Sequence, residues 1–398
     1  MTDSTRFAKV LKTPEVIALA FGAMIGWSWV LLTGVWLTAA GTIGTLIAFC
    51  VGGIAVTLIG LTYSELASAM PKAGGEHIYT ERALGSRWSF VCTWALLFSY
   101  VNVCMFEAVA LPSAVEYLYP DIRLGTLWNV LDSDVDLGFI LIGIGATALV
   151  TWVNYLGIRT AAILQAVVTA LIVVTGVLLI SGAIAFGDVN NAQPWIATPV
   201  SGILIVLIMV PSMLIGFDVI PQSAEEIDLP PNKIGRLLIF SVACAVAWYI
   251  LIAMAVGFGL TADALSTTKM ATADAATALW NGSWAGSLLV LGGIGGILTS
   301  WNAFIVGASR VLFALAESGH VPKVFAKLHP KYKTPYVGIL AIGALTMVAP
   351  LFGRTILVWL VNSGSFAVTI AFVFVAISFL VLRKTEPDMP RPFKVSHP

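Results

Sequence analysis

Charged residues are scarce in this sequence. Of its 398 residues, only 11% are Asp, Glu, Lys or Arg, whereas 59% are hydrophobic. Soluble domains carry about 25% charged residues, so a water-soluble fold would have too few polar side chains to cover this much apolar surface. The shortage excludes the soluble globular classes and favours a protein surrounded by lipid. Lysine plus arginine equal aspartate plus glutamate, 21 against 21, so net charge points to no polyanionic partner such as a nucleic acid.

Cysteine and histidine are also rare, with four of each. Cys50, Cys92, Cys104 and Cys244 all stand in apolar stretches, which favours buried thiols over a disulfide framework. The histidines lack metal-binding spacing. There is no Walker motif, and the glycine-rich stretch at 292–296 follows no predicted strand, so no nucleotide is expected. Because no nucleophile–base or metal constellation is visible, the sequence does not predict an enzyme.

Long apolar runs dominate what is present. A spanning helix needs about 20 mostly apolar residues, and these runs are continuously apolar, unlike the alternating strands of a membrane barrel. The first run is not followed by a small-residue cleavage site, so a spanning helix is expected there instead of a signal peptide. The pattern predicts an all-α membrane protein with ten transmembrane helices, at residues 15–38, 42–69, 87–116, 138–157, 160–187, 199–225, 235–260, 285–318, 336–352 and 356–382.

Positive charge predicts how these helices are oriented. With a cytoplasmic N-terminus, all but three of the 21 lysines and arginines fall in inside segments, the exceptions being Arg123, Lys269 and Arg354. We therefore expect a multi-pass protein of the cell membrane, inner or plasma, with both termini in the cytoplasm. The expected domains are a cytoplasmic N-terminus (1–14), a first five-helix repeat (15–187), a second five-helix repeat (199–382) and a cytoplasmic tail (383–398).

Glycine and proline interrupt two of the predicted helices. Helix 1 contains Gly22 and Gly26, and helix 6 runs from Pro211 through Gly216 to Pro221. Such residues weaken a helix, and unpaired backbone in hydrocarbon is costly unless it lines a polar cavity. Each interrupted helix is the first of a five-helix half, and the halves have opposite topology. Paired interruptions of this kind indicate the central site of a transporter, with small-residue packing between helices as the alternative.

These segments also carry a family resemblance that covers nearly the whole chain. Its motifs are Gly22-Ala23-Met24-Ile25-Gly26, then Pro71-Lys72-Ala73-Gly74-Gly75 with Tyr79, Gly216-Phe217-Asp218, and Ser309-Arg310-Val311-Leu312-Phe313-Ala314. With these motifs in this order, the chain resembles the amino acid–polyamine–organocation (APC) superfamily of permeases. The resemblance implies a 5+5 inverted-repeat transporter core with broken helices 1 and 6. Most members have twelve helices and many carry a Gly-Ser-Gly-like run after Gly26, whereas here ten helices are predicted and Trp27-Ser28 occupies that place.

The resemblance implies a substrate lying between helices 1, 3, 6, 8 and 10. Backbone amides would face an acidic substrate group and backbone carbonyls would face an amine. The amides are those near Gly26, Trp27 and Ser28, and the carbonyls those near Ala23, Met24, Ile215 and Gly216. Phe217, after the helix 6 break, would be an aromatic gate, with an ordinary core role as the alternative.

Helix 3 contributes Phe98, Asn102 and Glu107 as further candidates. An ionisable residue within a span is a functional hypothesis by default. Glu107 could attract a substrate ammonium group, carry a proton or pair with another helix. Asn102 could contact the substrate or form an interhelical hydrogen bond. For Asp218, in the helix 6 break, we favour a structural role, because a carboxylate can satisfy unwound backbone amides.

Helix 8 contains the hydroxyl pair Thr299-Ser300. In sodium-coupled relatives with the same core, such a pair joins helix 1 carbonyls, here those of Gly22 and Ile25, to bind Na⁺, a cation that takes oxygen ligands. Back-bonding of both hydroxyls to their own helix is the alternative. Proton coupling through Glu107 and exchange without an ion also stay open.

The sequence thus predicts a secondary active transporter that carries a small amino acid across the cytoplasmic membrane by alternating access. Na⁺ or H⁺ are the options for a coupling ion, and no other cofactor is expected. The alternative is a carrier or exchanger of an amine or organocation, polyamine- or ethanolamine-like, which Glu107 and the Trp27-Ser28 departure motivate. A channel or sensor on the same core is a third hypothesis. The expected partners are the small-molecule substrate and the lipid bilayer, without nucleotide or nucleic acid.

Overall fold

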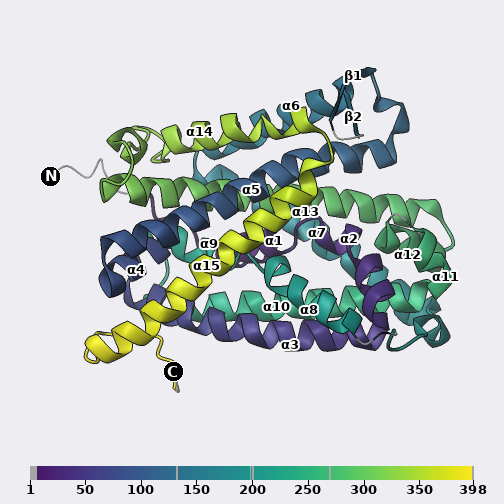
Figure 1. Ribbon diagram of the computed structural model, residues 1–398, viewed down its shortest axis with the longest axis horizontal. Coiled ribbons are helices and arrows are strands. Elements are labelled where there is room, and N and C mark those ends of the chain that lie inside the picture. Colours follow the sequence, from purple (N-terminus) through teal and green to yellow (C-terminus); the bar gives the residue numbers. More distant parts are fainter. Residues whose placement is uncertain (1–6, 131–132, 198, 200, 269, 397–398) are drawn as a thin grey trace.

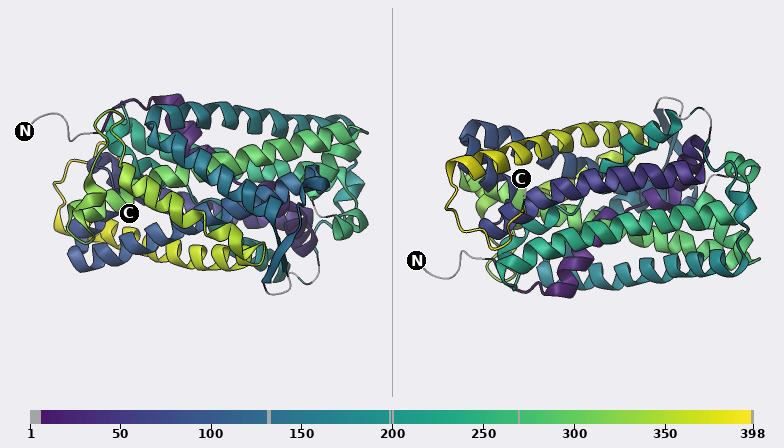
Figure 2. Two further views of the ribbon diagram at one scale, coloured as in Figure 1. Left: turned by 90° about the horizontal axis from the view of Figure 1, so that it is seen from above. Right: turned by 90° about the horizontal axis from the view of Figure 1, so that it is seen from below.

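The computed structural model describes residues 7–130, 133–197, 199, 201–268 and 270–396. Long helices lie side by side along the longest axis of the molecule (Figures 1 and 2). The α-helices are α1 (Thr13–Met24), α2 (Ser28–Leu31), α3 (Thr33–Ala69), α4 (Glu76–Leu84), α5 (Ser86–Leu118), α6 (Leu137–Tyr155), α7 (Ile158–Phe186), α8 (Ser201–Met213), α9 (Val219–Gln222), α10 (Pro231–Gly259), α11 (Ala262–Thr267), α12 (Ala271–Leu279), α13 (Ser283–Glu317), α14 (Tyr336–Thr346) and α15 (Ile356–Thr385). The strands are β1 (Thr126–Val130) and β2 (Ser133–Asp136), and the short 3₁₀ helices are η2 (Pro120–Ile122), η3 (Val189–Ala192), η4 (Ala224–Glu226), η5 (Lys323–Ala326) and η6 (Ala349–Phe352).

Seven helices among these residues are long and apolar enough to cross a membrane, namely α3, α5, α6, α7, α10, α13 and α15. The other three predicted spans coincide with shorter apolar helices: α1, α8, and α14 continued by η6. Two of these three, α1 and α8, are short because each ends at an interruption. The helical membrane architecture agrees with the sequence, whereas ten crossings and two repeats stay predictions.

A bend at Gly41 separates the first two predicted spans. The helix α3 runs on through this point, but Gly41 has φ +75°, a left-handed conformation that favours glycine. The segment before α8 binds the exposed backbone, since the Ala197 amide donates to the Ala40 carbonyl at 3.0 Å and the Ile43 amide donates to the Trp195 carbonyl at 2.8 Å. The boundary predicted at 38–42 is therefore this bend.

A small β-hairpin departs from the all-α prediction. Strands β1 and β2 pair antiparallel between α5 and α6, in the segment expected to be an outside loop. The carboxylate of Asp136 holds the hairpin closed, because it accepts from the amides of Gly125 (2.7 Å) and Gly138 (2.7 Å) and so caps the start of α6. Because single-sequence periodicity is weak in such a short element, the sequence predicts only a loop here.

The core of the bundle is α13. Its most apolar stretch is 83% buried, against 33% for α7. The glycine-rich run in α13 explains how other elements approach it closely. A Cβ added at Gly293 would stand 2.3 Å from the Trp27 ring, and one at Gly296 would stand 2.5 Å from the Gly26 carbonyl oxygen. The run is thus a helix-packing surface against the helix 1 break.

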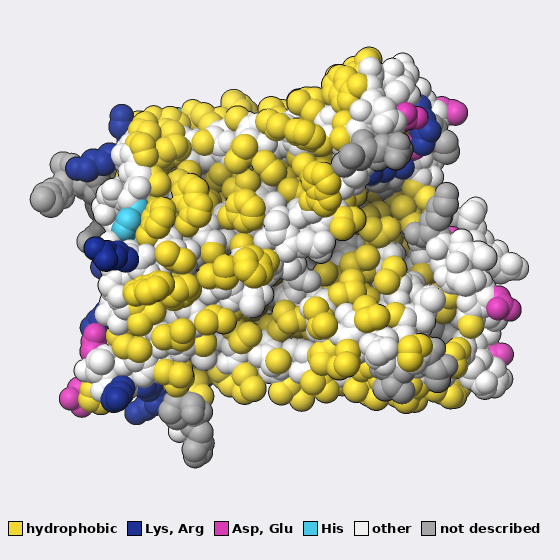
Figure 3. Space-filling view, in the orientation of Figure 1, with side chains coloured by type: hydrophobic (Ala, Val, Ile, Leu, Met, Phe, Trp, Pro, Cys, Tyr) yellow, Lys and Arg dark blue, Asp and Glu magenta, His cyan; other side chains and the backbone are white. Residues whose placement is uncertain are grey.

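The two ends of the molecule differ in charge. Both termini lie at one end, here called the terminal end, and the β-hairpin lies at the other, the hairpin end (Figure 1). On the face in Figure 3, an apolar belt separates lysines and arginines, mostly at the terminal end, from acidic residues, mostly at the hairpin end. Large exposed apolar side chains such as Ile184 and Ile208 suit contact with lipid. Arg6 and Lys269 of the charge count lie outside the described residues.

Candidate functional site

The two predicted interruptions are real breaks in the backbone. Helix α1 ends at Met24 and α2 begins at Ser28, while α8 ends at Met213 and α9 begins at Val219. The breaks touch at Gly216, where φ is +127°. A Cβ there would stand 2.7 Å from the Ala23 Cβ and 3.0 Å from the Met24 amide nitrogen. Glycine is required because a larger residue would push the two unwound segments apart.

Asp218 holds the second break in shape. Its side chain is fully buried. One carboxylate oxygen accepts from the Gly216 amide at 2.8 Å and the other accepts from the Tyr100 hydroxyl at 2.6 Å. Both oxygens are thereby committed to the unwound backbone and to α5, in agreement with the structural role favoured for this residue.

A hydroxyl that sequence reasoning did not single out connects both breaks. Tyr249, fully buried on α10, donates to the Met24 carbonyl at 2.8 Å and lies 3.3 Å from the Met213 carbonyl. Its oxygen is also 2.8 Å from the Ser28 hydroxyl. The available signal was a tyrosine inside an apolar span, since a buried phenol usually finds a hydrogen-bond partner.

A cavity of about 410 Å³ lies between the breaks and helices α5, α13 and α15. Nine of the predicted site residues line it: Ala23, Met24, Gly26, Trp27, Ser28, Asn102, Glu107, Ile215 and Ser300. Much of the remaining wall is apolar, with Val103, Phe106, Met209 and Phe304 among the lining side chains. The structure therefore brings helices predicted from distant segments to one chamber.

Glu107 is the acidic residue of this chamber. Its side chain is buried, and a Cβ on Gly26 would stand 3.1 Å from Glu107 Oε1 and 3.4 Å from the Ser300 hydroxyl. The second carboxylate oxygen, Oε2, has no hydrogen-bond partner among the described residues. A buried carboxylate with an unused oxygen is costly unless a proton or a cationic ligand neutralises it.

Three predicted substrate contacts do not line the cavity. Phe98 is 48% exposed on the outer face of α5, one position from Ser99, which does line it. Gly216 lies behind the lining, against Ala23. Phe217 is fully buried in an aromatic cluster, with its ring 5.3 Å from that of Tyr63 and 5.6 Å from that of Phe372. The face of α5 that meets the cavity could not be fixed from a continuously apolar sequence.

Asn102 has hydrogen-bond partners on its own helix α5 and on α15. Asn102 donates to the Phe98 carbonyl at 2.8 Å, and the Ser363 hydroxyl on α15 lies 3.4 Å from its side-chain oxygen. The Trp27 ring packs on Gly293 of α13 at one edge of the cavity. Asn102 thus makes the interhelical contact considered for it and lines the cavity, and its contact with a substrate stays a prediction.

The four residues predicted for a cation lie where α1 meets α13. The Thr299 hydroxyl donates to the carbonyls of Gly295 and Gly296, both at 3.1 Å, as the back-bonding alternative expects. A Cβ on Gly22 would stand 3.0 Å from Thr299 Cβ and 2.8 Å from the hydroxyl oxygen of Thr169. This Thr169 oxygen is buried and has no hydrogen-bond partner in the part of the chain that the structure describes.

Oxygen atoms and one amide nitrogen face this corner. The Ile25 carbonyl oxygen lies within 2.8 Å of a Cβ placed on Gly296, so it faces α13, and Ser300 reaches the cavity wall. The side-chain nitrogen of Gln165 would stand 2.5 Å from a Cβ on Gly22, and it donates to the Ala18 carbonyl at 3.2 Å. Carbonyl and hydroxyl oxygens, including the orphaned one of Thr169, fit a hard cation.

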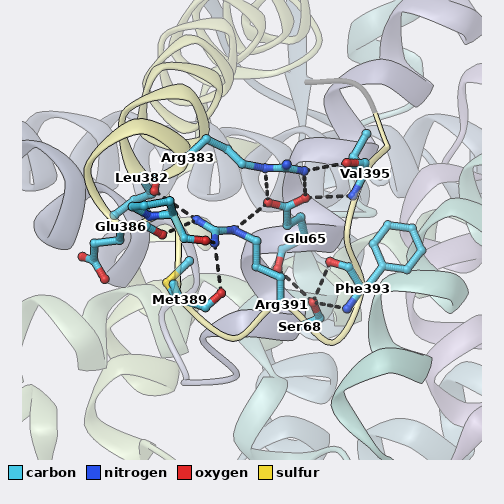
Figure 4. Close-up of polar contacts among 10 residues, drawn as sticks. Glu65, Ser68, Leu382, Arg383, Glu386, Met389, Arg391, Phe393 and Val395 are labelled. Carbon is cyan, nitrogen blue, oxygen red and sulfur yellow. Dashed lines mark hydrogen bonds and ion pairs between the residues drawn. The ribbon is translucent and has the colours of Figure 1, made fainter.

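The terminal end is held together by buried ion pairs. Arg310 of α13 binds Glu226 of η4 through two hydrogen bonds, of 2.8 and 2.9 Å, and both side chains are at most 2% exposed. Glu65 of α3 instead binds Arg383 and Arg391, and also accepts from the Val395 amide at 2.8 Å (Figure 4). The ion pair of Arg310 and the ion pairs of Glu65 thus form two separate clusters.

Comparison with known proteins decides the family. The sequence model described as amino acid permease matches residues 11–397, almost the whole chain. The chain belongs to the amino acid permease family. It is similar to the branched-chain amino acid permease BcaP of Bacillus subtilis (strain 168), with 28% identity over 96% of this chain and 82% of the relative. The methylthioribose transporter of the same strain is 26% identical over 99% of this chain and 85% of that relative.

A human relative is also similar along this chain. Cationic amino acid transporter 4 of Homo sapiens is 27% identical over 98% of this chain, which spans 63% of the relative's own length. The membership confirms the predicted APC resemblance, and the relatives are named as transporters or permeases and not as enzymes. This amino acid permease is accordingly a multi-pass membrane protein with several apolar helices.

Proposed function

We propose that this permease is a secondary transporter that carries a small amino acid by alternating access. The observation that supports this most is the contact of two helix breaks at one cavity, with Gly216 seated on Ala23. Unwound backbone at such a point offers carbonyls to an amine and amides to a carboxylate. The similarity to a branched-chain amino acid permease makes leucine the first ligand to try.

The lining favours a ligand with an ammonium group on an apolar body. Glu107 supplies a carboxylate with an unused oxygen, and Val103, Met209 and Phe304 supply apolar wall. Arg354 is the lining residue with a positive charge, and its guanidinium already pairs with Glu116 near the hairpin end. Leucine satisfies the ammonium and apolar requirements.

An amine carrier is the second candidate function, because a decarboxylated amine satisfies the same two requirements without needing a group for a carboxylate. The test is ligand binding to the purified full chain, by thermal shift and by direct titration. The probes are leucine, 3-methylbutylamine, which lacks the carboxylate, and 4-methylpentanoate, which lacks the amine. Binding of leucine with weak binding of 3-methylbutylamine supports the amino acid reading. Tight binding of 3-methylbutylamine supports the amine reading, and binding of neither overturns both.

The proposed architecture is ten crossings arranged as two five-helix repeats of opposite orientation, with α1–α2 and α8–α9 as corresponding broken helices. Its support is the pairing of the two breaks and the gathering of basic residues at the terminal end (Figure 3). We assign that end to the cytoplasm on the same ground. Single cysteines placed near Arg123 and near Lys331 in a chain without native cysteines test it. Labelling of the first from outside intact cells, and of the second only after permeabilisation, is expected.

We further propose that the cavity faces the hairpin side in this structure. Its lining extends to Arg354 and Val358, which are 44% and 63% exposed. Toward the terminal end, the cluster of Tyr63, Phe217 and Phe372 and the ion pair of Arg310 with Glu226 pack beneath the breaks. Opening toward the terminal end would require these contacts to separate, and this packing supports the proposal that Phe217 is a gate.

For the coupling ion we propose Na⁺ at Gly22, Ile25, Thr299 and Ser300, with Thr169 as an added oxygen donor. A cation held there would be coordinated by carbonyl oxygens of the first break and so stabilise its unwound form. Leucine uptake into proteoliposomes with Na⁺ replaced by choline tests this proposal. A large fall in uptake supports it, whereas unchanged uptake with a response to a proton gradient shifts the coupling to H⁺.

A further inference from the structure

Tyr249 occupies an unusual position between the two helix breaks. Its hydroxyl is fully buried behind the cavity wall and lies within 3.3 Å of three oxygen atoms, the carbonyls of Met24 and Met213 and the hydroxyl of Ser28. Met24, Met213 and Ser28 all line the cavity. One side chain of α10 therefore contacts both unwound segments and a cavity hydroxyl at once.

The number of protons fixes the direction of these hydrogen bonds. A carbonyl oxygen can only accept, and a phenol has a single proton to donate. The proton of Tyr249 is directed at the Met24 carbonyl, 2.8 Å away, a group that the break in α1 leaves without its helical donor. The oxygen of Tyr249 must then accept the proton of Ser28, at 2.8 Å.

This direction has a consequence for the cavity. With its proton committed to Tyr249, Ser28 presents only lone pairs to a ligand. Glu107 Oε2 is likewise an acceptor without a partner among the described residues, and Glu107 Oε1 lies near Gly26, two positions before Ser28. With Glu107 ionised, Ser28 at the first break and Glu107 beside it both accept and do not donate, a combination that suits an ammonium group and disfavours a carboxylate.

We propose that Tyr249 is a positioning residue that selects a ligand's ammonium group by holding Ser28 as a hydrogen-bond acceptor. The proposal rests on the proposed function and deepens it, because it assigns the chemical group recognised at the first break. Tyr249 does not touch the ligand. It acts through Ser28, and it also donates its proton to the Met24 carbonyl.

The test compares binding of two probes that differ only in the charged group. In Tyr249→Phe, Ser28 regains a free proton that can turn toward the cavity. We expect the dissociation constant of 3-methylbutylamine to rise about tenfold, equivalent to about 1.4 kcal/mol. The dissociation constant of 4-methylpentanoate is expected to stay the same or fall. A defect of folding or packing would weaken both probes alike, so opposite responses separate positioning from structure.

Two variants make the comparison sharper. Tyr79→Phe removes another fully buried hydroxyl, one without a partner in the described chain and outside the cavity lining, and should leave both probes unaffected. In a Ser28→Ala background, Tyr249→Phe should have no further effect on 3-methylbutylamine, since the group that Tyr249 orients is gone.

The outcomes separate this proposal from the proposed function. If the wild-type chain binds neither leucine nor 3-methylbutylamine, the proposed function fails and this inference falls with it. If the wild-type chain binds them but Tyr249→Phe changes both probes equally, or acts additively with Ser28→Ala, only the role of Tyr249 is overturned.

Discussion

Removing Glu226 should destabilise this protein far more than removing an acidic residue from a similar ion pair at the surface. Arg310 and Glu226 form a two-hydrogen-bond pair with both side chains at most 2% exposed. In Glu226→Ala the guanidinium stays buried, with only the Val306 carbonyl and the Ser309 hydroxyl as acceptors in the described structure. Breaking a buried pair from one side costs about 3–5 kcal/mol, because a charge is left uncompensated.

The matched control is Glu386→Ala. Arg82 and Glu386 form the same two-hydrogen-bond arrangement, but their side chains are 46% and 33% exposed, so water solvates the remaining arginine. We expect its unfolding free energy to stay close to that of the wild type. Unfolding is followed by tryptophan fluorescence during SDS titration of the purified protein in mixed micelles.

A double variant distinguishes a lost charge partner from lost packing. Glu226→Leu with Arg310→Met removes both charges and should recover much of the stability that Glu226→Ala loses, since a buried ion pair and apolar residues of similar size are often equivalent. The reasoning is refuted if Glu226→Ala is as stable as Glu386→Ala. It is also refuted if the double variant is less stable than Glu226→Ala.

Three other predictions follow from the same structure. Gly216→Ala should reduce leucine uptake at least tenfold, because its φ of +127° and the 2.7 Å approach to helix 1 exclude a Cβ, whereas Gly145→Ala, with open space around it, should not reduce uptake. Glu107→Gln should raise the dissociation constant of 3-methylbutylamine about 10- to 100-fold in a binding titration, because a charge-assisted hydrogen bond to the ligand is lost. An unchanged dissociation constant would show that Glu107 does not bind the ligand. Burial above all lowers the pKa of His77 to about 4. As pH falls from about 6.5 to 4, the unfolded chain therefore binds a proton that the folded chain does not. The free energy of unfolding should fall by up to about 3 kcal/mol over this range. Unfolding measured at stepped pH should show a smaller fall in His77→Gln.

The sequence predicts the framework of this molecule well where a local signal exists. Apolar runs locate the long helices, and glycine and proline locate both breaks, because backbone weakness is a property of a few adjacent residues. The bend at Gly41 falls between two predicted spans for the same reason. The hairpin of β1 and β2 was missed because its strands are short and partly polar.

Features that depend on distant residues could not be predicted from the sequence. The contact of Tyr249 with Met24 joins residues 225 positions apart. Phe98 and Ser99 are adjacent, yet one is exposed and the other lines the cavity, because the rotation of an apolar helix is set by its neighbours. Glu107 could be identified, since a carboxylate in a span stands out chemically wherever the helix faces.

The central claim is that the cavity at the two breaks is the site of a carrier. Counterflow in proteoliposomes tests it most directly. Vesicles containing the wild-type chain and loaded with unlabelled leucine are diluted into a trace of labelled leucine, beside vesicles containing Glu107→Gln. We predict transient accumulation of label in the wild-type vesicles that depends on the internal leucine and is strongly reduced in the variant. Uptake of label that internal leucine never accelerates would contradict a carrier and favour a channel or sensor.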